Sequence, residues 1–196
     1  EIPGFSVDML IDASSSRKQM QEQIAAQAYV LAESLEECGI PAQIYSYCSI
    51  RGFTVMRIFK DYEEEQVGNE LFGYVAAGNN RDGLALRAAG YLMEASKKAK
   101  RILLVLTDAN PMDDQNIGEG AFYTNKEYTD QPAIEDTARE VQRLKQKGIK
   151  VIGIFMGSAK SREAAREIFD RELVQIQNIN DFAGAVGRVL GEVMTP

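Results

Sequence analysis

The chain has 196 residues, 45% of them hydrophobic and 26% charged, which is the composition of one folded domain with a core of its own. Its 22 Lys and Arg against 29 Asp and Glu give a formal net charge of −7, which argues against a nucleic-acid or anionic-membrane surface. Because the sequence has no histidine, it excludes a Ser-His-Asp triad, a Cys-His dyad and a His-ligated zinc site.

The two cysteines, Cys38 and Cys48, form no CxxC motif, so they predict neither a disulfide framework nor a zinc knuckle. No stretch approaches the roughly 20 apolar residues of a membrane span, and no signal peptide opens the chain. We therefore expect no membrane insertion and a reducing, cytoplasmic setting. Because the chain starts at Glu1 without a methionine, we expect it to be a fragment of a longer protein or a trimmed chain.

The first half of the chain alternates apolar runs with a helical stretch. The helix is predicted because apolar side chains recur at spacings of four and three residues, and Gly39 followed by Pro41 ends it. The predicted elements are a strand at 6–11, a helix at 18–38, and a hairpin of strands at 42–49 and 54–59.

The second half carries two runs, 101–106 and 151–156, that are apolar on both faces, as central parallel strands are. Between them, 109–132 is the one long irregular stretch, a length that is usually functional or disordered. The other predicted elements are a short helix from the acidic residues 61–65 toward 75, helices at 84–97, 133–147, 161–170 and 181–193, and a short strand at 173–177.

This alternation of strands and helices predicts an α/β fold. We expect a doubly wound, mostly parallel, Rossmann-like sheet with helices on both faces and one antiparallel edge strand. No internal repeat or linker interrupts the pattern, so residues 1–196 are expected to form a single domain.

Oxygen-bearing side chains follow two of the predicted strands. The first strand ends in Asp12, with Ser14 and Ser16 on the turn after it, and the strand at 101–106 ends near Asp108. Ligands bind beyond the carboxyl ends of the strands in such sheets, so these groups are expected to meet there. An all-oxygen set of two carboxylates and two hydroxyls suits a hard divalent cation, Mg²⁺ or Mn²⁺. The loop 78–83 adds further amide and carboxylate groups.

Other roles fit some of the same residues. A Ser-rich turn before a helix is often only a cap, an Asp at a strand end is often a turn former, and the loop 78–83 can be a plain turn. A phosphotransfer or phosphatase-type enzyme with Asp12 as the nucleophile beside Mg²⁺ is the alternative function. The haloacid dehalogenase-like pattern requires Asp-x-Asp, however, and Ser14 stands in place of the second Asp.

Three motifs together resemble the loops of a von Willebrand factor type A (VWA) domain. They read DASSS at 12–16, NRDGLAL at 80–86 and LTD at 106–108, and the resemblance covers essentially the whole chain. It implies a metal-ion-dependent adhesion site (MIDAS), in which a cation bridges two proteins through an Asp or Glu of the partner. Such a domain is a binding module and not an enzyme.

Carried over to this sequence, the resemblance implies that Ser14 and Ser16 bind the metal through their hydroxyls. Asp12 and Asp108 would act mainly through bound water. The family usually has Thr where Asn80 stands here, so either Asn80 or Asp82 is expected to be the ligand from that loop.

A narrower resemblance is to the C-terminal domain of NorD-like nitric oxide reductase activation proteins and to the CobT cobalt chelatase subunit. It rests on NRDG at 80–83, IEDTARE at 134–140 and KGI at 147–149. It implies that the chain is the C-terminal part of a longer protein, since in that family the domain follows a longer N-terminal region. It also implies an accessory protein that works with a MoxR-type AAA+ ATPase to activate a metalloenzyme such as nitric oxide reductase.

The irregular stretch 109–132 leaves the same edge of the sheet as Asp108 and carries Phe122, Tyr123 and Tyr128. Aromatic side chains are enriched in interface hot spots, which favours contact with a partner. The other interpretation is that they hold the loop against its own domain.

Overall fold

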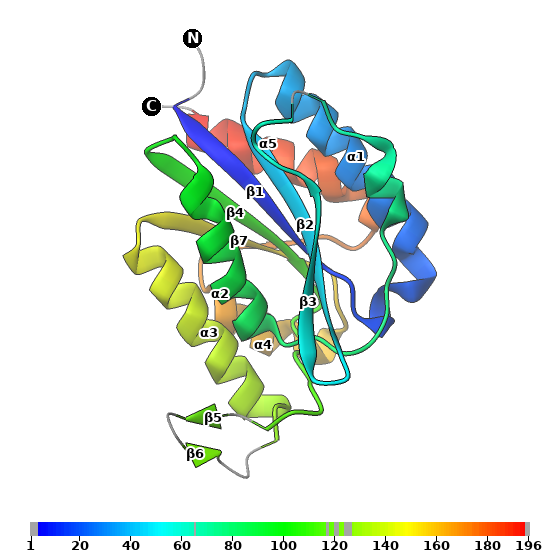
Figure 1. Ribbon diagram of the computed structural model, residues 1–196, viewed down its shortest axis with the longest axis vertical. Helices are drawn as coiled ribbons and strands as arrows, with labels where there is room; N and C mark the ends of the chain where they lie inside the picture. The colour runs from blue at the N-terminus through cyan, green and yellow to red at the C-terminus, as the bar shows by residue number, and fades with distance from the viewer. Residues whose placement is uncertain (1–3, 65, 117, 120–121, 124–126, 195–196) are drawn as a thin grey trace.

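The computed structural model describes residues 4–64, 66–116, 118–119, 122–123 and 127–194. Its centre is a six-stranded sheet in the order β3-β2-β1-β4-β7-β8 (Figure 1). All neighbours in this sheet are parallel except β2 and β3. The strands are β1 (Phe5–Asp12), β2 (Ala42–Ile50), β3 (Phe53–Lys60), β4 (Lys100–Thr107), β7 (Ile149–Phe155) and β8 (Leu173–Gln175).

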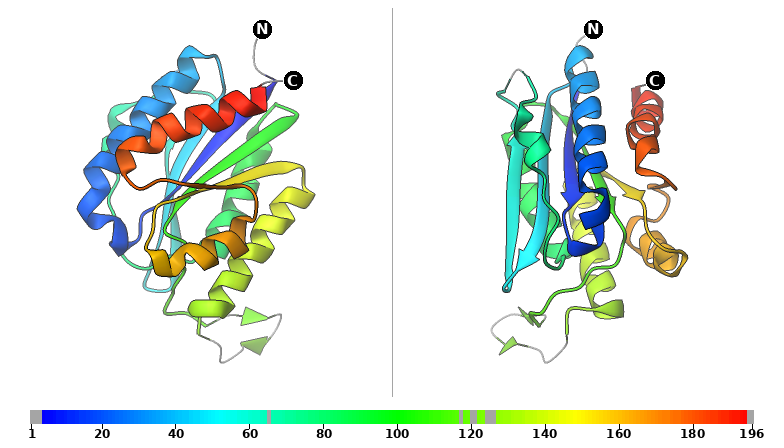
Figure 2. Two further views of the ribbon diagram at one scale, coloured as in Figure 1. Left: turned by 180° about the vertical axis from the view of Figure 1, so that it is seen from behind. Right: turned by 90° about the vertical axis from the view of Figure 1, so that its right-hand side faces the viewer.

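Helices cover both faces of the sheet, which gives three layers (Figures 1 and 2). One face carries α1 (Gln21–Glu37) and α5 (Phe182–Met194). The other carries α2 (Asp82–Leu92), α3 (Asp130–Gln146) and α4 (Arg162–Phe169). The described residues also contain the short 3₁₀ helices η1 (Ser15–Met20), η2 (Asn69–Gly73), η3 (Met93–Ala95), η4 (Ala159–Ser161) and η5 (Ile179–Asp181).

The sequence of β1 explains its central position. Successive side chains of a strand point to opposite faces, and here both faces are buried along the whole strand. Val7, Met9 and Ile11 pack into the cluster under α1 and α5, whereas Leu10 packs with α2, α3 and α4. The mostly parallel sheet with helices on both faces and an antiparallel edge strand, predicted from the sequence, is confirmed.

The connections reverse direction at β1. The chain passes from β1 through α1 to β2 on one side, and from β3 through α2 to β4 on the other side of β1. The loops at the carboxyl ends of β1 and β4 therefore diverge, which opens a crevice where ligands bind in open α/β sheets. Asp12 and Asp108 lie at this point.

Some of the predicted elements differ from the structure; for example, α1 begins at Gln21 instead of 18, after the 3₁₀ helix η1. The acidic residues after β3 do not start a helix, because Asp61 Oδ1 accepts the backbone N–H groups of Glu63 (2.8 Å) and Glu64 (3.1 Å) and closes a turn; Glu65 lies outside the described residues. Helix α2 spans Asp82–Leu92 instead of 84–97. Helix α3 begins at Asp130 instead of 133, since a proline is tolerated in the first turn.

The stretch predicted as irregular contains a small antiparallel pair, β5 (Gly118–Glu119) with β6 (Phe122–Tyr123). Within the described ranges no helix is long and apolar enough to cross a membrane.

Candidate metal centre

The loop after β1 gathers three of the predicted ligands. Asp12, the last residue of β1, is 1% exposed, and its Oδ1 accepts the backbone N–H of Ser14 at 2.8 Å. This turn brings the Ser14 hydroxyl to 3.0 Å from the Ser16 hydroxyl. The motif Asp-x-Ser-x-Ser thus places one buried carboxylate and two hydroxyls at the carboxyl end of the sheet.

The loop after β4 brings its carboxylate to the same place. Asp108 directly follows β4, and its Oδ2 accepts a hydrogen bond from the Ser16 hydroxyl at 2.7 Å. Its Oδ1 accepts the backbone N–H of Asn110 at 3.2 Å. Ser14, Ser16 and Asp108 therefore form one continuous chain of oxygen atoms across the two loops.

The third loop is docked against the first. Gly78 has φ +67°, and its carbonyl oxygen accepts both the N–H (3.0 Å) and the hydroxyl (2.7 Å) of Ser15. A side chain at position 78 would collide with the Ser49 carbonyl oxygen, so only glycine fits this turn.

Asn80 and Asp82 face each other within this loop. Asn80 Nδ2 donates to Asp82 Oδ1 at 3.0 Å, and the Tyr47 hydroxyl donates to the same oxygen at 2.8 Å. Tyr47 is on β2 directly beside Asp12 in the sheet register. Asp82 is therefore held under the loop by two donors.

A small pocket of about 130 Å³ opens over these groups. Asp12 and Asp82 lie buried below it, and neither is among the described residues that line it. Its described walls comprise Ser14, Ser15, Ser16, Gly78, Asn79, Asn80, Asp108, Asn110 and Met112.

Arg17 is a member of this site that the sequence analysis missed. It is 2% exposed, with Nε 3.5 Å from Asp12 Oδ2 and Nη2 3.0 Å from Asp108 Oδ2. Nη1 donates to the Met156 carbonyl oxygen at 2.9 Å. The only signal in the sequence is a basic residue directly after the Asp-x-Ser-x-Ser motif.

The electrostatics of the site reflect its burial. Burial, and next the nearby Asp108 carboxylate, raise the pKa of Asp12, whereas Arg17 lowers it. Burial and the Asp12 carboxylate also raise the pKa of Asp82 well above its usual range, against the lowering effect of the Tyr47 hydrogen bond. Positive charge brought close to these carboxyl groups would favour their ionised forms.

The side chains around this pocket can be compared with the ligands that a metal cation requires. Across the described part of the chain, no three His, Cys, Asp or Glu side chains come together as a metal-binding group. The oxygens that face the pocket are instead hydroxyl, amide and carboxylate oxygens. Such oxygens fit Mg²⁺ or Mn²⁺ and would not hold a soft metal.

The structure shows the role of one of the three aromatic residues singled out in the stretch 109–132. Tyr128 is buried, and its hydroxyl accepts the backbone N–H of Gly83 at 3.0 Å, so this side chain holds the loop against its own domain. A side chain at position 83 would meet the Tyr128 hydroxyl and the Asp136 carboxylate, which explains the glycine there. The side chains of Phe122 and Tyr123 lie outside the described part of the structure.

No protein-family model matches the chain. Two curated proteins resemble it, the uncharacterized protein PA0525 of Pseudomonas aeruginosa (27% identical over 138 residues) and the uncharacterized protein YojO of Bacillus subtilis (22% over 166 residues). The alignments cover 68% and 80% of this chain but 21% and 24% of those proteins, so the chain spans less than a quarter of their length.

Solved structures resemble the fold more fully. The vWF domain of the type V pili tip protein Mfa5 from Porphyromonas gingivalis superposes with a TM-score of 0.73 at 10% identity, covering 96% of this chain and 94% of that domain. The pilus adhesin SpaC from Lactobacillus rhamnosus GG gives 0.69 at 14% identity, over 96% of this chain and 30% of the adhesin. The PilB minor pilin from Streptococcus sanguinis gives 0.66 at 12% identity, over 96% and 61%. The chain therefore has a VWA-like fold, as predicted.

Proposed function

We propose that this domain is a divalent-cation-dependent protein-interaction module with a metal-ion-dependent adhesion site. Ser14, Ser16, Asn80 and Asp108 would hold Mg²⁺ or Mn²⁺ from the wall of the pocket, and the buried Asp12 would act through bound water. The cation would offer a Lewis-acidic position to an Asp or Glu of a partner. The observation that carries the proposal is the convergence of the Ser14, Ser16 and Asp108 oxygens on one pocket at the point where the chain reverses direction.

Each group of this chain has a distinct task in the proposal. The Ser14 and Ser16 hydroxyls are neutral, so they leave the cation electrophilic. Asp12 orients the turn through the Ser14 N–H, and Asp108 orients Ser16. Arg17 balances part of the negative charge of Asp12 and Asp108 when no cation is bound.

Calorimetric titration of Mg²⁺ and Mn²⁺ tests the metal site. The wild-type domain is expected to bind, and Asp12→Ala and Asp108→Ala are each expected to bind at least about tenfold more weakly, because each loses a charged group of the site. Asp114→Ala, an exposed carboxylate near the same edge, is the matched control and should bind like wild type.

The titration is repeated with a short acidic peptide present, since a carboxylate from outside completes the coordination. Unchanged binding in both site variants, or no binding of wild type in either arm, would contradict the proposal.

Asn80 is the ligand we assign to the third loop. It lines the pocket, whereas Asp82 is buried below and held by Tyr47 and Asn80. Asn80→Ala is therefore expected to weaken Mn²⁺ binding about tenfold, and Asp82→Asn to weaken it less, as measured by calorimetry. If Asp82→Asn weakened Mn²⁺ binding more than Asn80→Ala does, Asp82 would be the ligand instead.

The partner is expected to be acidic where it meets the site. A second pocket of about 530 Å³ adjoins the first through Ser16, Asp108 and Asn110, and Arg162 also lines it. An acidic segment with one carboxylate at the metal could continue along this pocket toward Arg162.

We further propose that the parent is a NorD/CobT-like accessory protein that works in the cytoplasm with a MoxR-type AAA+ ATPase. The resemblance of the 80–83 and 134–140 motifs supports this, together with the much greater length of the curated relatives. Pull-down of such an ATPase by the wild-type domain with Mg²⁺, and not by Asp12→Ala, would support this role.

The phosphotransfer alternative is disfavoured by the position of Asp12. Its carboxylate is buried, accepts the Ser14 N–H and faces Arg17, so it is not presented to a substrate. We propose a non-catalytic domain. Phosphatase turnover by wild type that is lost in Asp12→Asn would overturn that assignment.

A further inference from the structure

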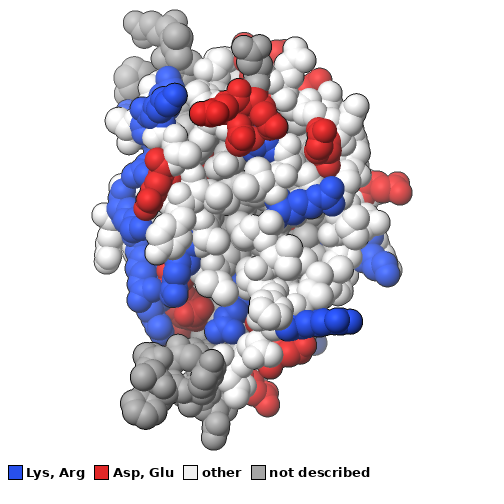
Figure 3. Space-filling model, in the orientation of Figure 1, with Lys and Arg blue, Asp and Glu red and all other residues white. Residues whose placement is uncertain are grey.

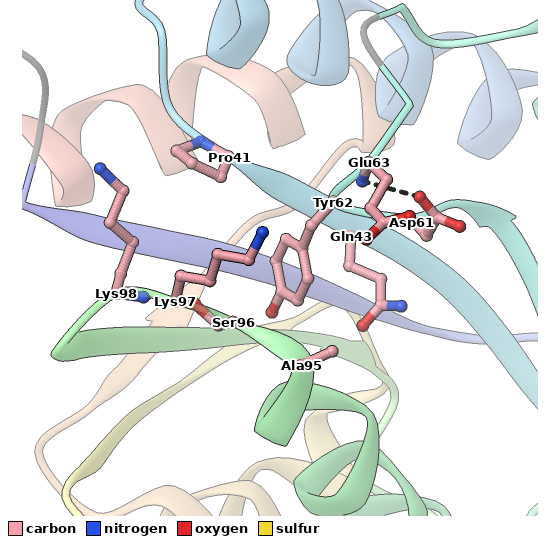
Figure 4. A pocket seen from close by; sticks show the side chains of 9 residues that line it. All are labelled: Pro41, Gln43, Asp61, Tyr62, Glu63, Ala95, Ser96, Lys97 and Lys98. Carbon is pink, nitrogen blue, oxygen red and sulfur yellow. Dashed lines mark hydrogen bonds between the residues drawn. The ribbon is translucent and has the colours of Figure 1, made fainter.

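Another pocket lies at the opposite end of the sheet from the candidate metal centre (Figure 4). Its volume is about 370 Å³, within the range of small-molecule sites. It is formed by the start of β2, the segment that follows β3, and the connection from η3 to β4. The residues that line it are Pro41, Gln43, Asp61, Tyr62, Glu63, Ala95, Ser96, Lys97 and Lys98.

Gln43 supplies a buried polar group that is not satisfied by the protein. Its side chain lines the pocket and is 4% exposed, and Oε1 finds no hydrogen-bond donor among the described residues. A buried acceptor without a donor is costly, so this oxygen favours a ligand that brings an N–H or O–H group.

Tyr62 forms one wall of the pocket, and a hydrogen bond to β1 holds its side chain in place. Its hydroxyl donates to Asp8 Oδ1, and Asp8 Oδ2 accepts the Tyr45 hydroxyl at 2.8 Å. Ser96, which also lines the pocket, is joined to Ser6 on β1 at 2.7 Å. These contacts tie both sides of the pocket to β1, so the cavity is built into the fold.

The rim carries both signs of charge. Lys97 follows η3, and Figure 4 shows its side chain extending toward Tyr62. Asp61 and Glu63 lie on the other side, next to Gln43 in the same view. Figure 3 likewise shows acidic and basic side chains together at this end of the molecule.

We infer that this pocket binds a small zwitterion with an apolar body, of the chemical class of free amino acids with an apolar side chain. The ammonium group would donate to Gln43 Oε1 close to Asp61 and Glu63, and the carboxylate would meet Lys97. The ring of Tyr62, with Pro41 and Ala95, supplies apolar walls for the side chain. A ligand with one charge would leave one side of this rim unpaired.

The test is calorimetric titration of L-leucine, L-methionine and L-phenylalanine into the domain in EDTA, which removes any contribution from the metal centre. We expect saturable binding of at least one of them. Its N-acetyl derivative, which lacks the ammonium, and its methyl ester, which lacks the carboxylate, are each expected to bind at least about tenfold more weakly.

Lys97→Gln and Gln43→Met are expected to weaken binding by a similar factor. Lys97 is exposed, so its replacement leaves the fold intact. Lys145→Gln on α3, away from the pocket, should bind like wild type. The proposal is overturned if none of the three amino acids binds, if the blocked derivatives bind equally well, or if Lys97→Gln and Gln43→Met bind like wild type.

Discussion

Replacing Arg17 with methionine is expected to destabilise the metal-free domain by about 3 kcal/mol. Arg17 is buried between the carboxylates of Asp12 and Asp108, and removing one partner of a buried ion pair leaves the other charges uncompensated. Methionine keeps most of the side-chain volume. The loss of stability therefore measures the contribution of charge and hydrogen bonding and not that of packing. Urea unfolding in EDTA measures the free energy directly.

The comparison variants for this experiment are Arg17→Lys and Arg162→Met. The Arg17→Lys variant keeps the positive charge and should lose less stability than Arg17→Met. Because Arg162 lines the adjoining pocket outside this ion-pair group, Arg162→Met should lose little stability. Under the proposed function, Mg²⁺ should restore stability to Arg17→Met, since ligands that bind only the folded state stabilise it. Equal stability of Arg17→Met and wild type in EDTA would show that Arg17 does not balance these carboxylates.

Asp8→Asn is expected to stabilise the domain above neutral pH. Burial raises the pKa of Asp8 from 3.8 to about 7, against the lowering effect of hydrogen bonds from Tyr62 and Tyr45. A carboxyl group with a raised pKa in the folded state binds more protons there than in the unfolded chain. Stability is therefore lost as the pH rises from about 4 to about 7, by roughly 4 kcal/mol at 1.36 kcal/mol for each pH unit.

The neutral amide keeps hydrogen-bonding capacity toward both tyrosines and has no charge to bury. The gain in unfolding free energy over wild type should accordingly be small at pH 4 and reach about 4 kcal/mol at pH 8. Urea unfolding across this pH range provides the measurement, and the exposed Asp114→Asn is the control. A gain that does not change with pH would show that Asp8 is not protonated in the folded domain.

The sheet and the main loops of the site could be predicted from the sequence because they follow from local patterns. Runs that are apolar on both faces give central strands, and parallel strands bring their carboxyl ends to one edge. These patterns alone predict that Asp12 and Asp108 lie close together, and Ser16 on the loop after Asp12 does donate to Asp108.

The features that could not be predicted depend on contacts between distant segments. Nothing local in Arg17 indicates that it reaches Asp108 and the Met156 carbonyl, which come from other strands. The acidic residues after β3 carry the composition of a helix start, but the Asp61 side chain competes for the backbone N–H groups and closes a turn. The sequence analysis also gives no role to Asp8, a carboxylate inside an apolar strand, because its partners Tyr45 and Tyr62 come from other segments.

The stretch after β4 is closed at its base. The Asp113 N–H donates to the Tyr128 carbonyl at 2.9 Å, Met112 exchanges backbone hydrogen bonds with Asn80, and the Tyr128 hydroxyl takes the N–H of Gly83. The excursion between 113 and 128 thus begins and ends at one point of the scaffold. An insertion between these two points is therefore expected to leave the oxygens of the neighbouring loops in place, because the hydrogen bonds at Met112, Asp113 and Tyr128 remain. Under the proposed function, the cation site is thus anchored separately from this excursion.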